Sequence, residues 1–455
     1  MSSFSNRDFA APVQHDQQVV SSPLARRFLQ VRAHSNALAA PLSEADCQVQ
    51  SMPDASPVKW HLAHVTWFFE TLVLERFEPD FEPYHPAFRV LFNSYYNGIG
   101  HQHPRAQRGL ITRPSLAEVQ AYRRAVDDRI LLLLREPPAR HDDAADLYRL
   151  VELGLQHEQQ HQELLLTDVL HLLSCNPLSP VYRQRWPLGS VAPLALDWVP
   201  FEAGLVETGH GDDEAFAFDN ESPRHRSWLQ PYALANRLVT NGEWLNFMAN
   251  GGYRDPRWWL AAGWEWLQGG RILAPMHWRQ LSDRHDTPWQ CFTLHGLVDV
   301  DPHTPVTHIS LYEADAFARW TAAQTGLKLR LATEAEWEHA AAPLAAAGIA
   351  AGNFLESQAL HPMPVACHPT GPRPQLTQMF GDVWEWTSSS YLPYPGYQAW
   401  SGVVCEYNGK FMVNQTVLRG GSCATPRSHI RASYRNFFPA DARWQFTGMR
   451  LARDL

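Results

Sequence analysis

Five prolines between residues 176 and 200 divide the chain into two halves with different sequence patterns. Proline lacks a backbone donor and clashes with the preceding helical turn, so neither a long helix nor a central strand can cross this segment. Before it, apolar residues recur at intervals of three and four over long windows, which is typical of amphipathic helices. After it, apolar runs are short and alternate with Gly, Pro and Asn turns. The sequence therefore predicts two domains joined by a linker.

Four helices are predicted in the first half from their apolar spacing and their end signals. The second begins at Ser56-Pro57, an N-cap residue followed by proline at the first helical position. The four are expected over residues 21–42, 56–77, 114–136 and 144–174. They predict a helical bundle. Residues 78–113 between them are rich in Pro, Gly, Asn and aromatics, and an ordered loop of that length tends to be functional.

The second half is predicted to be a loop-rich α+β domain with short strands. Helical spacing is confined to three short stretches, residues 240–249, 312–325 and 333–342. The expected division is a disordered tail over 1–20, a helical bundle over 21–175, a linker over 176–196 and an α+β domain over 197–455.

Composition and charge exclude several classes of protein. The chain has 455 residues, 45% of them hydrophobic, which is ample for buried cores and excludes a disordered or fibrous protein. It carries 38 Lys and Arg against 47 Asp and Glu with no basic block, so we expect no nucleic-acid partner and no membrane partner. No apolar run reaches the roughly 18 residues of a membrane helix, and no signal peptide is visible. Six scattered cysteines without a C-x-x-C pair add to the expectation of a cytoplasmic protein with reduced thiols.

The strongest chemical signal is the string QHEQQHQE in the fourth predicted helix. His157 and His161 are four residues apart, so they lie on one helical face and can present two imidazoles to one metal ion. With Glu158 the string is a literal H-E-x-x-H, the motif of zinc proteases. The extended protease motif needs Gly at 164 and His at 167, where this chain has Leu164 and Thr167. A zinc hydrolase is therefore a weaker alternative, as is a pair of histidines that merely faces solvent.

A third metal ligand is expected from the second helix, which carries His61 and His64 among aromatic residues. Helices of a bundle build metal sites from facing side chains. Three neutral imidazoles leave coordination positions open for a substrate and dioxygen, as non-haem iron(II) chemistry requires. The spacing of the residues does not decide between His61 and His64.

Long stretches of the chain resemble a known family of two-domain enzymes. The order SMPDASPVKWHLAHVTWFFE, NSYYNGIGHQHPRAQRG and GLQHEQQHQELLLTD is similar to the DinB-like four-helix bundle of the ergothioneine-type sulfoxide synthases. The second half resembles the formylglycine-generating-enzyme domain (C-type-lectin-like) that follows it there, through ATEAEWEHAA, FGDVWEWTSSSYLPYPGY, VLRGGSCATP and YRNFFPADARWQFTGMRLARD. The selenoneine synthases share this plan. The resemblance implies the fold class: a helical bundle followed by a loop-rich α+β domain.

The resemblance also implies a cofactor, a cosubstrate and a substrate. The iron ligands of the family fall on His64, His157 and His161, and His61 falls where the family uses no ligand. The family combines oxygen activation at Fe(2+), with O2 as cosubstrate, with carbon–sulfur or carbon–selenium bond formation at the imidazole C2 of hercynine. In one branch a tyrosine from the loop after the second helix donates a proton, and NSYY places Tyr95 and Tyr96 there. Tyrosines in an aromatic loop can also serve packing alone.

Substrate contacts are implied at two further places. Asn414 and Gln415 match the position where family members contact the amino-acid end of hercynine, and an amide is a neutral donor to a carboxylate. Three arginines flank the NSYY loop and are candidates for a second substrate that is anionic or rich in hydroxyls: Arg89, Arg105 and Arg108. The alternatives are amides that cap local backbone and arginines that face solvent.

The identity of the donor substrate rests on two departures from the family pattern. Family members often have Pro where this chain has Ala332 and Cys where it has Val413. These changes favour a selenosugar, and hence selenoneine synthesis, over cysteine or γ-glutamylcysteine, which remain alternatives. The further alternatives from other classes are the zinc hydrolase and a metal- or sugar-binding module without catalysis.

Overall fold

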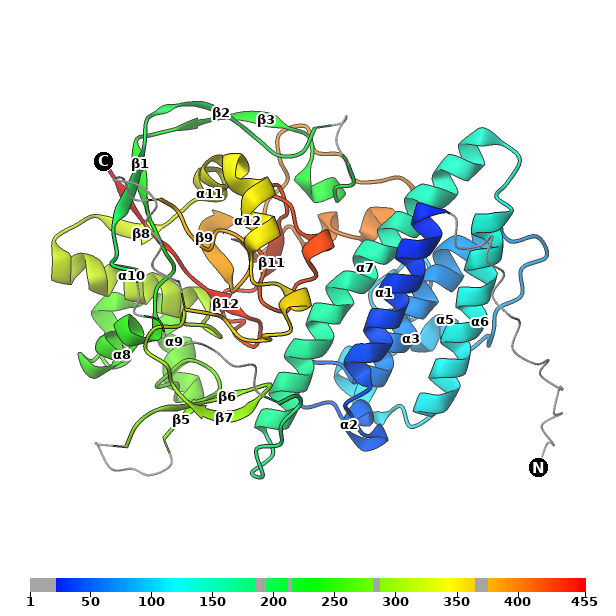
Figure 1. The fold of residues 1–455 in the computed structure, drawn as a ribbon, viewed down its shortest axis with the longest axis horizontal. Helices are drawn as coiled ribbons and strands as arrows, with labels where there is room; N and C mark the ends of the chain where they lie inside the picture. Colours follow the sequence, from blue (N-terminus) through cyan, green and yellow to red (C-terminus); the bar gives the residue numbers. More distant parts are fainter. Residues whose placement is uncertain (1–21, 185–190, 192–193, 212–214, 281–286, 365–374) are drawn as a thin grey trace.

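The computed structural model describes the chain from residue 22 onward, apart from residues 185–190, 192–193, 212–214, 281–286 and 365–374. The predicted tail over 1–20 lies outside the described residues. Figure 1 shows a helical body and a mixed body side by side, with helix α7 running along the boundary between them. In the segments that are described, every helix is too short or too polar to span a lipid bilayer.

The helical body contains the four long helices that the apolar spacing predicts. They are α1 (Pro23–Ala39), α3 (Val58–Phe69), α6 (Leu116–Arg135) and α7 (His141–Ser174). Helix α6 begins at a capping box, in which Ser115 and Glu118 each accept a hydrogen bond from the backbone N–H of the other. Every residue of α3 is buried, because α1, α6 and α7 all contact it. This central helix and α7 are the two that carry the predicted metal ligands.

The helical segment that begins with α3 continues beyond the end of its α-helical hydrogen bonding. A π-helical turn, Glu70–Leu74, continues it into the short helix α4 (Glu75–Phe77). Three short elements escape the sequence prediction: α2 (Glu44–Gln48), α5 (Phe88–Leu91) and a 3-10 turn (Arg105–Leu110). Each covers too few residues for a periodic apolar pattern to develop. The last two lie in the segment that was expected to be a continuous loop.

The mixed body is built on two four-stranded sheets. The first has the order β1 (Trp198–Phe201), β4 (Tyr232–Ala235), β13 (Leu451–Asp454), β8 (Leu329–Leu331). The second has the order β11 (Asn436–Phe438), β10 (Thr416–Arg419), β9 (Trp384–Ser390), β12 (Thr447–Gly448). Neighbouring strands are antiparallel except for the parallel pair β12 and β9. The C-terminal strand β13 thus lies inside a sheet, which ties the two ends of this body together.

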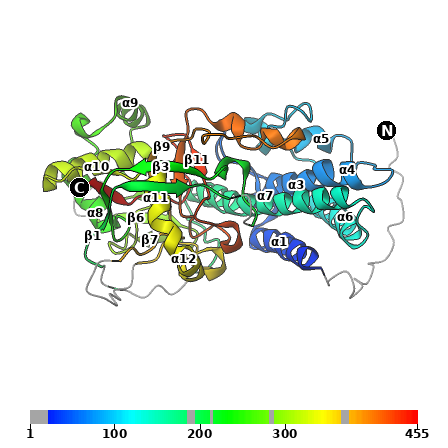
Figure 2. The same ribbon diagram turned by 90° about the horizontal axis from the view of Figure 1, so that it is seen from above.

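Smaller sheets and helices surround these two. The small sheets are β2 (Gly204–Thr208) with β3 (His225–Leu229), and β5 (Trp278–Arg279) with β6 (Gln290–Thr293) and β7 (Gly296–Asp299). The three predicted helices are confirmed as α8 (Asn241–Ala249), α10 (Leu311–Thr325) and α11 (Glu334–Ala341), each of which begins at a capping box. Two helices were not predicted, α9 (Ala261–Gly270) and α12 (Ala345–Ala351). Figure 2 shows α8, α9 and α10 at the end of this body that lies away from the bundle.

The two bodies are joined through a buried carboxylate on α7. Glu163 accepts hydrogen bonds from Trp384 Nε1 at 2.8 Å and from Thr425 Oγ1 at 2.7 Å, and also from the hydroxyl of Ser422. Burial raises the pKa of Glu163, and the three donors oppose that rise. The Glu163 carboxylate therefore receives these three hydrogen bonds from the second domain, and the three donor groups of the second domain bond to α7 through this carboxylate.

We expect Glu163→Leu to loosen the contact between the two bodies, because it leaves three buried donors without an acceptor. Each unsatisfied donor costs about 1–3 kcal/mol. Urea unfolding measured by circular dichroism should show a lower free energy of unfolding, and limited proteolysis should cut the variant faster. The matched control is Glu356→Leu, because Glu356 is exposed and, among the described residues, accepts from the backbone N–H of Arg427. Equal effects of the two substitutions would contradict the role given to Glu163.

Candidate functional site

Three histidines meet between α3 and α7. His64 comes from α3, and His157 and His161 come from successive turns of α7. One nitrogen from each ring can be chosen so that all three lie within 4.8 Å of one another. Nε2 of His64 and Nε2 of His157 are 3.2 Å apart. In the part of the chain that the structure describes, this is the group of three or more His, Cys, Asp or Glu side chains whose geometry suits a metal ion.

The protein holds these three imidazoles in the form that binds metals. Burial lowers the pKa of His157 to about 3 and places the pKa values of His64 and His161 well below their usual range. All three rings are therefore neutral near pH 7, and neutral imidazole is the ligand form. Nδ1 of His64 lies 2.7 Å from the backbone carbonyl of Phe92, so this nitrogen carries the proton and Nε2 carries the lone pair.

Aromatic rings surround the three histidines. The His64 ring is stacked between Trp60, at 4.6 Å, and Trp67, at 5.5 Å. The His157 ring is stacked on Phe68 at 4.4 Å. These contacts fix the ring planes and keep water away from the bundle side of the site. The WHLAHVTWFF string of the sequence thus supplies one of the three histidines and the rings that hold it.

His61 lies beside the group of His64, His157 and His161 but does not belong to it. Its Nδ1 lies 2.8 Å from Nδ1 of His161, and its Nε2 lies 3.0 Å from a carboxylate oxygen of Asp168. Both ring nitrogens are therefore engaged by neighbours. Residue spacing left His61 and His64 as alternatives, the family resemblance implied His64, and the structure brings His64 to the other two.

Glu158 does not face the histidines. Its carboxylate is fully buried in the bundle and accepts from Arg32 at 2.7 Å, from Arg123 at 2.9 Å and from Ser35 at 2.6 Å. Burial alone would raise the pKa of Glu158, but the two guanidiniums outweigh it and hold the pKa at about 2. A zinc protease uses the Glu of H-E-x-x-H as a general base beside the metal. Because Glu158 is committed to a buried ion pair, the zinc-protease alternative loses its base.

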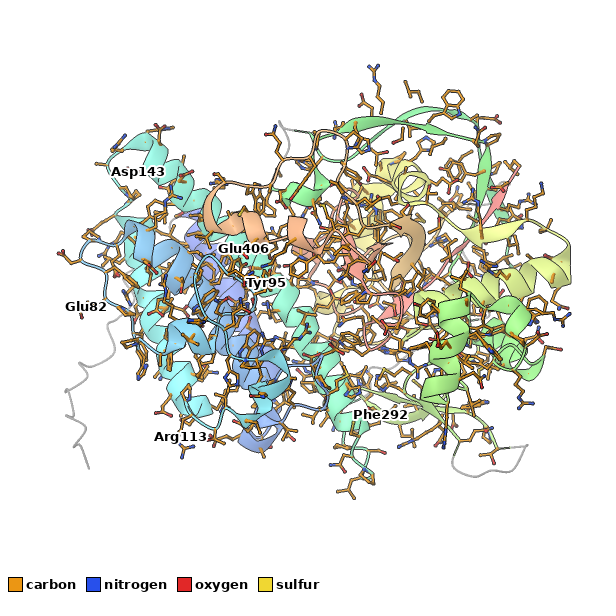
Figure 3. The ribbon with its side chains drawn as sticks, turned by 180° about the vertical axis from the view of Figure 1, so that it is seen from behind. Glu82, Tyr95, Arg113, Asp143, Phe292 and Glu406 are labelled. Carbon is orange, nitrogen blue, oxygen red and sulfur yellow. The ribbon has the colours of Figure 1, made fainter. Side chains whose placement is uncertain are left out.

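The NSYY loop reaches the site from the side of the bundle. Figure 3 shows Tyr95 and Glu406 close together, where the second domain covers the bundle. The Tyr96 ring centroid lies 5.7 Å from that of Trp67 and 6.4 Å from that of Phe68, the rings that stack on His64 and His157. Tyr95 stacks on Tyr96 at 4.7 Å.

Both phenols of this loop keep their protons near pH 7. Burial raises the pKa of Tyr95 to about 12 and raises the pKa of Tyr96 well above its usual range. The loop is held from the second domain, because Glu406 accepts from the backbone N–H of Gly98 at 2.7 Å and Lys410 donates to the carbonyl of Tyr95. Ordering of the two tyrosines therefore depends on the contact between the domains.

A hydrogen-bonded network on the second domain was missed from the sequence. Gln160 lies on α7 between the two histidines of that helix, and it donates to the Tyr434 hydroxyl at 2.8 Å and accepts from the Tyr407 hydroxyl. The Tyr407 ring lies 5.9 Å from His157. His429 links the Tyr434 hydroxyl, at 2.9 Å, to Gln156 at 2.6 Å. The glutamines beside the H-E-x-x-H histidines were the sequence feature that could have indicated this network. Their hydrogen-bond partners could not be predicted, because they are more than 240 residues away along the chain.

The predicted substrate-binding residues take different positions. Arg108 is buried, donates to the Ser56 hydroxyl at 2.9 Å, and lies 3.4 Å above the Trp60 ring. Burial lowers the pKa of Arg108 to about 9. Arg89 pairs with Glu75 at the surface, and Arg105 donates to the carbonyl of Asp54.

The two amides lie on the connection before β10. Asn414 is exposed with a left-handed φ of 53°, and Gln415 is half-buried. The backbone carbonyl of Gln415 accepts from the N–H of Tyr391 at 2.9 Å. No hydrogen bond or ring contact joins either amide, or Arg89 or Arg105, to the three histidines among the described residues. Of the five predicted contacts, Arg108 places its guanidinium on the Trp60 ring of the site, whereas Arg89 contacts the site through its backbone carbonyl, which accepts from Trp67 Nε1 at 3.2 Å.

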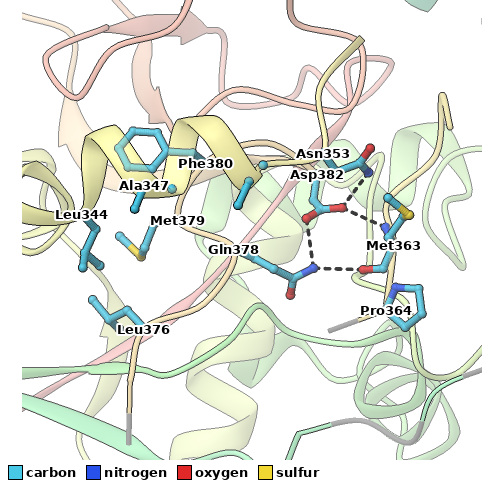
Figure 4. Close-up of a pocket in the computed structure, with 13 residues that line it drawn as sticks. Leu344, Ala347, Asn353, Met363, Pro364, Leu376, Gln378, Met379, Phe380 and Asp382 are labelled. Carbon is cyan, nitrogen blue, oxygen red and sulfur yellow. Dashed lines mark hydrogen bonds between the residues drawn. The ribbon is translucent and has the colours of Figure 1, made fainter. Parts of the chain in front are cut away.

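Two cavities lie away from the histidines. One, of about 420 Å³, is lined by α12 and residues 376–382, and in Figure 4 the Asp382 carboxylate accepts from Asn353, Met363 and Gln378. The other, of about 410 Å³, lies between the π-helical turn, α7 and residues 401–404, and Arg89 is on its wall. The three histidines line neither cavity.

Comparison with known proteins agrees with this arrangement of two domains. Residues 27–165 match the DinB superfamily, and residues 194–455 match the sulfatase-modifying factor enzyme 1-like domain. A protein named hercynine oxygenase from Mycolicibacterium thermoresistibile is 33% identical over 95% of each chain. The chain belongs to the hercynine oxygenase family. It is therefore an enzyme, and its fold is the bundle and α+β domain that the resemblance implied.

Other members and relatives of the hercynine oxygenase family match the same two-domain arrangement in whole or in part. The hercynine oxygenase of Mycobacterium tuberculosis is 32% identical over 90% of this chain and 94% of its own. The formylglycine-generating enzyme of Streptomyces coelicolor is 28% identical and covers 56% of this chain and 88% of its own. The hercynine oxygenase relatives thus span both domains, whereas the formylglycine-generating enzyme covers about half of the chain.

We expect Glu158→Ala to act on stability, because it removes the carboxylate to which the buried Arg123 donates and leaves Arg32 with Asp127 as its remaining carboxylate partner. Breaking a buried ion pair costs about 3–5 kcal/mol. The free energy of unfolding, measured in urea, should fall by that amount. The matched control is Asp146→Ala on the same helix, because Asp146 pairs with Arg76 at the surface and exposed pairs contribute about 0–1 kcal/mol. A Glu158 variant as stable as the Asp146 variant would show that this cluster does not support the bundle.

Proposed function

We propose that the chain is a non-haem iron(II), O2-dependent enzyme that bonds sulfur or selenium to the imidazole C2 of hercynine. One observation carries the proposal. Three neutral, buried or half-buried histidines converge between α3 and α7 in a member of the hercynine oxygenase family. Membership of that family supports an ergothioneine-type reaction. The proposal adds the metal, the donor substrate and the residues that act in the reaction.

The three histidines suit an iron(II) ion. Imidazole nitrogens bind Fe(2+), and three of them leave positions open for other ligands. Such an ion supplies oxygen activation when it is bound. The residues of this chain hold the ligand rings by stacking, through Trp60, Trp67 and Phe68, and keep them unprotonated by burial.

Aromatic side chains of the second domain support hercynine as the substrate. The Tyr407 ring lies beside His157, with Phe218 stacked on it at 5.3 Å and Trp400 at 6.1 Å. A trimethylammonium group is a cation that binds to aromatic faces. Asp219 is buried next to this group of rings and accepts from Asn408 at 2.7 Å, so a negative charge is near by. Gln160, which bonds to Tyr407, can donate or accept at the imidazole.

For the donor we propose a selenosugar, which would make the product a selenoneine-type compound. The support is the pair of departures at Ala332 and Val413, together with the arginines around the NSYY loop. A selenol is more acidic than a thiol, so it reaches the site as an anion near pH 7, and the anion is the usual ligand form. A thiol donor, cysteine or γ-glutamylcysteine, is the second candidate.

The experiment starts from protein purified anaerobically and loaded with Fe(2+). We expect oxygen uptake that needs hercynine and a donor together, and a product whose mass shows a new carbon–selenium or carbon–sulfur bond. His64→Ala should abolish iron binding and product formation, because the loss of one of the three ligands leaves an incomplete site. Competition between 1-selenoglucose, cysteine and γ-glutamylcysteine at equal concentration then identifies the donor. Preference for either thiol would overturn the selenosugar and leave the reaction class intact, whereas no oxygen uptake with any donor would overturn the function itself.

A separate prediction concerns the NSYY loop, where we propose that Tyr96 or Tyr95 donates a proton during bond formation. The Phe variant of the donor should bind iron and hercynine normally but form product about 10²–10⁴-fold more slowly, which is typical for loss of a general acid. Single-turnover product formation measures this directly. Tyr84→Phe is the control, because Tyr84 packs on Phe88 at 6.1 Å on another part of the bundle. Unchanged turnover in the double Tyr95→Phe, Tyr96→Phe variant would show that these rings only pack.

A further inference from the structure

Asp168, His61 and His161 form a chain of hydrogen bonds that ends at the three-histidine site. Asp168 and His161 are seven residues apart on α7, so they lie two turns from each other, and His61 from α3 lies between them. The two contacts are 3.0 Å, from Asp168 to His61 Nε2, and 2.8 Å, from His61 Nδ1 to His161 Nδ1. The side chains of His61 and Asp168 are only 4% and 6% exposed, so water does not compete for these bonds.

The direction of each hydrogen bond follows from the carboxylate. An ionised carboxylate only accepts, so His61 Nε2 carries a proton and donates it. A neutral imidazole has one donor and one acceptor nitrogen, so Nδ1 of His61 is an acceptor. Nδ1 of His161 must therefore donate to it. This leaves the lone pair of His161 on Nε2.

The carboxylate itself is fixed by another segment of the bundle. Asp168 also accepts from the backbone N–H of Ser56 at 2.8 Å, at the start of α3. The Ser56 hydroxyl accepts from Arg108, whose guanidinium covers the Trp60 ring that stacks on His64. The same few residues therefore hold the rings of two of the three predicted ligands.

We propose that Asp168 and His61 are positioning residues for His161. Asp168 holds His61 in the tautomer with its proton on Nε2, and His61 holds His161 in the tautomer with its proton on Nδ1 and its Nε2 free to bind a metal. Neither residue is itself a ligand. This inference rests on the proposed metal site, and it explains why a fourth histidine lies beside a site that needs three.

Metal affinity of the purified full-length protein tests the proposal without any turnover. The dissociation constants of Co(2+) and, anaerobically, Fe(2+) are measured by equilibrium dialysis. We expect His61→Leu and Asp168→Leu each to raise Kd by about 10–100-fold, the usual effect of losing an outer partner of a ligand. His61→Asn should retain most of the affinity, because its amide oxygen can take the place of Nδ1 as the acceptor for His161. His171→Leu is the matched control, because His171 is on the same helix and bonds to Ser51 instead.

Two further readouts separate positioning from a general loss of structure. The visible absorption spectrum of bound Co(2+) should change in His61→Leu and match the unchanged protein in His61→Asn. The double variant His61→Leu, Asp168→Leu should lose less affinity than the two single losses combined, because Asp168 acts on His161 through His61. Circular dichroism of the metal-free variants reports their folding, and if His61→Leu fails to fold, the comparison of Asp168→Leu with Asp168→Asn, which keeps an acceptor oxygen, decides the question.

The outcomes are distinct. Unchanged Kd in His61→Leu, or equal loss in His61→Asn and His61→Leu, would overturn the positioning role while the unchanged protein still binds metal. Failure of the unchanged protein to bind Co(2+) or Fe(2+) would overturn the proposed metal site, and the positioning role with it.

Discussion

The buried ion pair between Glu158 and the guanidiniums of Arg32 and Arg123 fixes the rotation of α7. Successive residues of a helix point about 100° apart, so a carboxylate held inside the bundle determines where its neighbour His157 points. Arg32 also donates to Asp127 at 2.7 Å, which ties α1 and α6 to the same cluster. Any rotation of α7 would leave charge buried without a partner, and that costs several kcal/mol. The geometry of the site thus depends on charges that take no part in it.

Helix α7 serves both domains because its sides carry different chemistry. Its 34 residues contact α1 and α3 on one side, and residues of the second domain on the other. The histidines lie at the boundary, with Gln156, Gln160 and Glu163 beside them facing the second domain. An active site between two domains gives each domain a separate task. In the proposed site the bundle supplies the three histidines, and the second domain supplies the tyrosines and aromatic rings beside them.

Much of the fold could be predicted because its signals are local. Apolar spacing, capping residues and prolines predict the long helices α1, α3, α6 and α7, since each signal acts within a few residues along the chain. Short elements such as α2 and α5 escaped because their sequences do not complete enough turns. Strand order escaped as well, since β13 pairs with strands that precede it by more than 100 residues.

The sequence by itself determined that two histidines share one face of a helix, because a spacing of four residues is a property of that helix alone. The spacing of residues did not decide which histidine of α3 joins them, and the family resemblance only implied His64. The tertiary structure brings His64 there, because His64 and His157 are 93 residues apart and the packing of α3 on α7 sets their distance. The same holds for Glu158, which the H-E-x-x-H string presents as a catalytic base and which the bundle commits to two arginines. A motif specifies which side chains are present, whereas long-range packing and buried charge specify what each side chain meets.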